Sequence, residues 1–123
     1  MPASLAWSLI VLIAITGCAS WTPRPAPDQG SLAGTWHGRV SGIAGNGMAV
    51  LTILHDGNYS GTIFLETGDR PFHGAITVID AHRARYQSSV GTGRVFQDER
   101  DGRRVLRFVQ DGGGGGAVFT ADQ

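Results

Sequence analysis

The sequence predicts an all-β fold, a small antiparallel up-and-down barrel of about eight short strands, and two observations lead to this prediction. Runs rich in Ile, Leu, Val, Thr and Phe recur at short, regular intervals after residue 31, and Gly, Asp or Asn separates them, as is typical of strands joined by tight turns. No window after residue 18 has sustained helical periodicity. Antiparallel neighbours joined by short loops close most simply into a barrel, which also removes exposed strand edges.

The composition agrees with a single turn-rich β domain. The chain has 123 residues, of which 19 are glycine, 41% are hydrophobic and only 16% are charged, enough for one hydrophobic core. Its ten basic residues, all Arg, are balanced by ten acidic ones. Because the net charge is zero, we expect no nucleic acid partner and no general attraction to polyanions.

Each predicted strand is a short apolar run bounded by turn residues. The expected ranges are 35–42, 49–54, 59–66, 72–79, 83–88, 93–97, 105–110 and 117–121.

The clearest hairpin spans residues 49–66, and its register decides which side chains face the core. A three-residue loop that ends at a left-handed Gly57 would place Ile53 opposite Tyr59. A two-residue turn that ends at the same glycine would place Leu54 there instead, and would exchange the inner and outer faces. We favour the three-residue loop because it gives the more continuous apolar inner face.

In that register the inner face carries many large side chains, so we expect the barrel to be filled rather than hollow. An eight-stranded barrel is only just wide enough to be filled or to hold one small ligand. The expected interior residues of the other strands are Trp36, Val40, Ile76, Val78, Tyr86, Val95, Leu106, Phe108 and Phe119. The same register points Val50, Leu54 and Phe64 outward, which would form a patch for docking a partner.

Gly34 and Trp36 form a Gly-x-Trp motif at the start of the first predicted strand. The motif and the strand count resemble the opening of lipocalins and avidin-like barrels, in which the tryptophan plugs the barrel floor. The resemblance implies that Trp36 closes one end. It also implies an alternative function, carriage of a small apolar ligand inside the barrel.

The N-terminal region predicts that the protein is attached to a membrane. Residues 6–16 form an uncharged apolar run, shorter than the roughly 20 residues that span a bilayer, and a small residue and then Cys18, the only cysteine, follow it. The tetrapeptide Ile15-Thr16-Gly17-Cys18 resembles the lipobox of bacterial lipoproteins. The resemblance implies that residues 1–17 are a signal peptide and that Cys18 carries acyl chains such as palmitate.

Two features near this motif bear on the predicted location of the protein. Ala19 and Ser20 stand where a lipoprotein retained in the inner membrane would have an aspartate, so the resemblance implies the outer membrane, facing the periplasm. The first eight residues lack the Lys or Arg that signal peptides usually carry. Either the signal is atypical or the true start lies upstream.

Between Cys18 and the barrel, alternating prolines at positions 23, 25 and 27 predict an extended, semi-rigid tether that holds the domain off the bilayer. The expected organisation is therefore a signal peptide over 1–17, a lipidated cysteine and tether over 18–30, and a β-barrel domain over 31–123.

The sequence contains no motif for catalysis, metal binding or a cofactor, so we expect no enzymatic activity and none of these groups. The histidines fall singly at positions 37, 55, 73 and 82, and the carboxylates lie mostly at turns. One candidate anion-binding surface stands out on the outward faces of three consecutive strands, formed by Arg83, Arg85, Arg94 and Arg107. The alternative is a solvated face neutralised by Asp98, Glu99 and Asp101.

These features together predict a membrane-anchored envelope lipoprotein that acts as a non-enzymatic binding or interaction module. Its partner would be an envelope glycan, lipid or protein. The alternatives are the carrier of a small apolar ligand and an inhibitor of an envelope hydrolase.

Overall fold

The computed structural model describes residues 22–42 and 45–122, and most of them belong to strands. The elements in chain order are β1 (Thr22–Pro23), the 3-10 helix η3 (Gln29–Leu32), β2 (Gly34–Gly42), β3 (Gly47–Ile53), β4 (Asn58–Leu65), β5 (Gly68–Asp80), β6 (Arg83–Ser88), β7 (Gly91–Arg100), β8 (Arg103–Gln110), the 3-10 helix η4 (Asp111–Gly113) and β9 (Gly115–Ala121).

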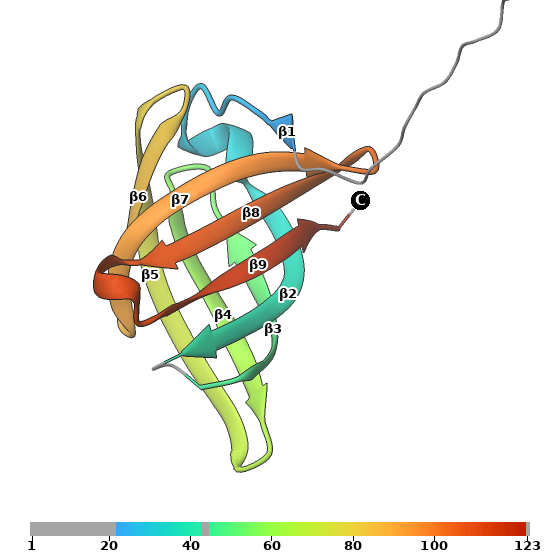
Figure 1. The fold of residues 1–123 in the computed structure, drawn as a ribbon, viewed down its shortest axis with the longest axis vertical. Coiled ribbons are helices and arrows are strands. Elements are labelled where there is room, and N and C mark those ends of the chain that lie inside the picture. The colour runs from blue at the N-terminus through green and yellow to red at the C-terminus, as the bar shows by residue number, and fades with distance from the viewer. Residues whose placement is uncertain (1–21, 43–44, 123) are drawn as a thin grey trace, which may run out of the picture.

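Strands β2 to β9 form a closed antiparallel barrel, shown in Figure 1. Each strand pairs with the next along the chain, and β2 pairs with β9 to close the sheet, with Gly38 opposite Phe119. The predicted all-β, eight-stranded up-and-down barrel is therefore confirmed. The largest boundary difference is in β5, which begins at Gly68 and extends the β4–β5 hairpin past the barrel wall.

The hairpin between β3 and β4 has the predicted three-residue loop, with Ile53 opposite Tyr59. Gly57 has a φ of 92° and donates its N–H to the Leu54 carbonyl oxygen at 3.0 Å. Its own carbonyl oxygen accepts the N–H of Ile76 at 2.9 Å, which ties the loop to β5. A Cβ at position 57 would lie only 2.4 Å from the Ile76 oxygen, so the loop needs glycine for space as well as for conformation.

The barrel interior is a continuous apolar core, and the interior residues predicted from the register are buried, apart from Val78 and, in the hairpin, Leu65, which are partly buried. The sequence alone did not predict that Ala26, Leu32 and Phe72 would join this core. The alternation of apolar and polar positions therefore found most of the core, because in a barrel every second residue of each strand faces inward.

One end of the barrel is closed by Trp36, whose side chain is 0% exposed. The indole Nε1 donates to the Leu32 carbonyl oxygen at 3.0 Å, so the buried N–H is satisfied. The guanidinium of Arg104 lies over the ring, 5.0 Å from its centroid. The closed end is therefore formed by Trp36, by η3 and by the start of β8, where Arg104 lies.

The segment predicted as a free tether lies against this closed end over its described residues. Thr22 pairs with Glu99 of β7, the N–H of Arg24 donates to the Gln97 carbonyl oxygen at 2.9 Å, and Ala26 is buried. The pairing is possible because β6 leaves β7 after Val95, where an edge of β7 becomes available. Thr22 and Pro23 form the short strand β1 there, and an edge tolerates proline because the N–H that proline lacks is not needed by a neighbouring strand. We call residues 22–28 the strap.

Candidate functional site

A small interior cavity lies at the end of the barrel away from Trp36, among the ends of β2, β6 and β8 and the start of β9. It offers about 50 Å³ to the centre of a water-sized sphere, room for a few water molecules. Ligand pockets in proteins have volumes of roughly 300 Å³ or more. The cavity is therefore a residual gap in a filled barrel.

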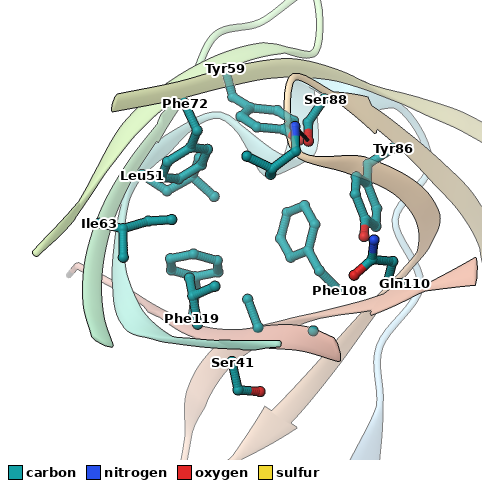
Figure 2. Close-up of a pocket in the computed structure, with 14 residues that line it drawn as sticks. Ser41, Leu51, Tyr59, Ile63, Phe72, Tyr86, Ser88, Phe108, Gln110 and Phe119 are labelled. Atoms are coloured by element: carbon teal, nitrogen blue, oxygen red, sulfur yellow. Dashed lines mark hydrogen bonds between the residues drawn. The ribbon is translucent and has the colours of Figure 1, made fainter. Parts of the chain in front are cut away.

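Figure 2 shows aromatic side chains from several strands arranged around this gap. The ring of Phe108 makes edge-on contacts with Tyr86, Phe119 and Tyr59, at centroid distances of 5.1, 5.6 and 6.0 Å. Phe72 extends the network through Tyr59 at 6.2 Å. Such arrangements place the positive edge of one ring against the face of the next, so this network holds the rings in fixed positions.

Glycines on the inner face of the strands make room for these rings. A Cβ at Gly61 would lie 2.6 Å from the ring of Phe72, and one at Gly74 would lie 2.6 Å from the hydroxyl oxygen of Tyr59. Sequence reasoning did not use these positions. The signal was available, because a glycine inside a strand often marks a site of close approach.

The polar groups at the cavity come from a few side chains at its rim. Ser88 accepts the Val90 N–H at 3.0 Å and donates to the Gly91 carbonyl oxygen at 3.1 Å, which builds the β6–β7 turn. In Figure 2 Ser41 points away from the cavity. Burial raises the pKa of Tyr59 to about 12, partly offset by its hydrogen bond with Ser88. Both this tyrosine and Tyr86, whose pKa burial also raises, are neutral at ordinary pH.

The structure brings the four predicted anion-binding arginines onto the outer face but gives each of them a neighbour. Arg83 pairs with Asp80, its Nε 2.6 Å from Oδ2, and Arg85 pairs with Asp111. The other two lie against the ring of Phe96 and are described next. The predicted surface is thus largely neutralised, as in the alternative interpretation, although the carboxylates are mostly not the expected ones.

A cluster on the outer face of β7 and β8 holds the remaining two arginines. The Cζ atoms of Arg94 and Arg107 lie 5.5 and 4.7 Å from the centroid of the Phe96 ring. Arg107 Nε also donates to Oδ2 of Asp98 at 2.7 Å, and Asp98 is only 4% exposed. A buried carboxylate needs such a partner, so Arg107 is part of the fold. Whether these four arginines bind an anion stays a prediction.

The outward apolar patch is present on β3 and β4. Phe64 is 46% exposed and stands opposite Met48, which is 50% exposed. Leu54, at the other end of β3, is also exposed, while Val50 is half-buried. The patch is therefore narrower than predicted and centres on the Met48–Phe64 pair.

The other predicted sites concern metals, histidines and the membrane anchor. Among residues 22–42 and 45–122, no three His, Cys, Asp or Glu side chains gather as metal ligands. His37 is placed beside Asp122, with its Nδ1 2.7 Å from Oδ1. Cys18 and residues 1–17, the predicted signal peptide, lie outside the described residues. In the described part of the chain no helix is both long and apolar enough to cross a membrane.

These observations define the protein as a small antiparallel barrel whose interior is filled by its own side chains. The chain matches no family model, no curated protein and no solved structure. The lipobox and Gly-x-Trp resemblances therefore stay predictions based on short motifs.

Proposed function

We propose that the chain is a lipid-anchored protein of the bacterial envelope that acts through the outside of its barrel, as a non-enzymatic binding or interaction module. The anchor is the part that rests on sequence, on the lipobox at Cys18. The mode of action rests on one structural observation, the interior gap of about 50 Å³. Because a lipocalin-like carrier needs a cavity several times larger, the outer surface is the better candidate for the binding face.

Neither alternative function has a comparable observation in its favour. A carrier would need the aromatic network around Phe108 to open. A hydrolase inhibitor would need a loop that reaches into a catalytic cleft, and the glycine-rich segment at η4 is held against the barrel instead, with Asp111 accepting from Arg85 and from Thr92 Oγ1.

The anchor is tested by metabolic labelling with a fatty acid in a bacterial host, comparing the wild-type chain with Cys18→Ala. We expect label on the wild-type chain, none on the variant, and accumulation of unprocessed wild-type precursor when globomycin is added. Equal labelling and processing of the two chains would contradict the anchor.

The mode of action is tested by native mass spectrometry of the full chain after extraction in mild detergent. We expect the acylated chain to carry no small molecule whose binding depends on the interior gap. A matched variant, Ala117→Leu, fills the gap from β9 without touching the outer face. An apolar adduct present in the wild type and absent from that variant would show interior binding and contradict the proposal.

A further inference from the structure

A second concave site lies outside the barrel, at the closed end, where the strap, the β7–β8 turn and the end of β9 meet (Figure 1). Its lining is dominated by three arginines, Arg24 of the strap and Arg103 and Arg104 of β8, together with Gly102, Ala121 and Asp122. Its volume is about 410 Å³, within the range of small-molecule sites. We call it the arginine cleft.

The positive charge of the arginine cleft is poorly compensated. Within the residues that the structure describes, Arg103 has no carboxylate within 4.0 Å. Arg24 lies 3.8 Å from Glu99, in a pair whose side chains are both nearly half exposed and which therefore contributes little. Asp122 is the acidic residue of the lining, and its carboxylate already contacts His37.

Contacts with the barrel hold the side chain of Arg104 in place at the edge of the arginine cleft. Its guanidinium stacks on Trp36 and Nη1 donates to the Ser31 carbonyl oxygen at 2.8 Å. Burial, and then the charge of Arg24, lower the pKa of Arg104, which means that the two guanidiniums repel each other in a partly desolvated place. An anion between them would relieve that repulsion.

Several guanidiniums around one concavity are suited to a phosphate group. Each guanidinium presents planar N–H donors that match phosphate oxygens, often two at a time. A phosphate has enough oxygens to accept from more than one arginine, whereas a carboxylate has two. The four arginines predicted from the sequence lack this arrangement, because three of them already pair with Asp80, Asp98 and Asp111.

The position of the cleft indicates where the phosphate comes from. The strap begins at Thr22, four residues after Cys18, and four extended residues span at most about 14 Å. An acylated Cys18 would therefore keep the closed end of the barrel within reach of the lipid headgroups. We propose that the arginine cleft binds the phosphate of a membrane phospholipid headgroup, so that the barrel rests on the bilayer by its closed end. The orientation rests on the proposed anchor, whereas the phosphate chemistry does not.

The test uses the full chain in uncharged detergent micelles, doped either with phosphatidylglycerol or with the same amount of neutral diacylglycerol. Binding is measured from the shifts of the arginine side-chain signals in ¹H–¹⁵N NMR spectra of the protein, which can be recorded with either lipid, and a separate titration uses inorganic phosphate. The cleft variant is Arg24→Gln with Arg103→Gln, both exposed in the structure. The matched control is Arg83→Gln with Arg85→Gln, which removes the same charge from β6.

We expect the cleft variant to lose about tenfold or more in affinity for phosphatidylglycerol, because each charge-assisted hydrogen bond is worth about a factor of ten. The control should change less than about twofold. Equal losses in the two variants, or no loss in the cleft variant, would overturn the site. Inorganic phosphate binding as tightly as the lipid would overturn the headgroup as its source.

Two further measurements separate this proposal from the others. Circular dichroism checks that the variants are folded. Arg103→Gln alone, at an exposed position, must also lower the affinity for phosphatidylglycerol. Acylation of Cys18 is measured separately from headgroup binding, by fatty-acid labelling. Acylation without arginine-dependent binding contradicts only the cleft, and arginine-dependent binding without acylation contradicts only the anchor.

Discussion

Trp36→Ala is expected to be the most damaging substitution in the barrel. The ring is completely buried, and replacing a buried Trp by Ala typically costs about 3 to 5 kcal/mol. The Leu32 carbonyl oxygen also loses its donor and Arg104 loses the ring beneath it, which adds about 1 kcal/mol. The expected loss, about 4 to 6 kcal/mol, is a large part of the roughly 5 to 15 kcal/mol that stabilises a typical domain.

The assay is urea unfolding of the full chain followed by far-ultraviolet circular dichroism, because the substitution removes a fluorophore. Trp36→Phe separates the contributions: it keeps an aromatic ring at the closed end but removes the indole N–H, so about 1 to 3 kcal/mol should be lost. Phe64→Ala is the matched control. It removes an aromatic ring that is nearly half exposed, and less than about 1 kcal/mol should be lost.

The reasoning would be refuted by a loss below about 1 kcal/mol for Trp36→Ala with an unchanged dependence on urea concentration. That result would mean that the ring does not hold the closed end together. A loss for Phe64→Ala as large as that for Trp36→Ala would equally show that the inner and outer faces have been assigned the wrong way round.

Three further predictions concern the interior and the outer face. Tyr59 has a pKa of about 12 in the folded protein, against 10.0 for an exposed tyrosine. The folded state therefore holds the proton more tightly, and the free energy of unfolding should fall as pH rises from about 10 to 12. In urea titrations at those pH values, Tyr59→Phe should reduce that fall by about 2 kcal/mol. Gly74→Ala places a Cβ 2.3 Å from the Gln87 oxygen and 2.6 Å from the Tyr59 hydroxyl, and should cost about 1 to 3 kcal/mol in the same assay; a neutral result would mean that the wall of the barrel yields there. Asp98→Ala removes the carboxylate that the partly buried Arg107 contacts, and should cost about 2 to 4 kcal/mol of stability. Asp80 is exposed, so Asp80→Ala should cost less than about 0.5 kcal/mol. Equal losses for the two variants would contradict the burial of Asp98.

Local patterns were sufficient to predict the barrel. Alternation of apolar residues identified the inner face, and the turn residues separated the strands. The register at Gly57 followed from asking which loop length gave the longer apolar face, and the structure agrees because burial of that face outweighs any preference of the turn itself.

The remaining features depend on pairs that are distant in the sequence. The strap contains the proline pattern of a tether, and nothing within it shows that β6 leaves part of β7 uncovered. Asp98 looked like one of several surface carboxylates, and its burial depends on Arg107 in the next strand. The arginine cleft could not be predicted for the same reason, since Arg24 meets Arg103 and Arg104 only after the sheet has closed.

The pairing of β2 with β9 also sets the order in which the molecule can be made. Strand β2, residues 34–42, pairs with β3 and with β9, residues 115–121. Nearly all of the domain must therefore be synthesised before β2 has both of its neighbours. Contacts between such distant segments form slowly, because a long loop must close before they are gained. Until then the inward side chains of β2, Trp36 among them, lack their final packing. The chain is therefore most prone to aggregate before β9 has paired with β2.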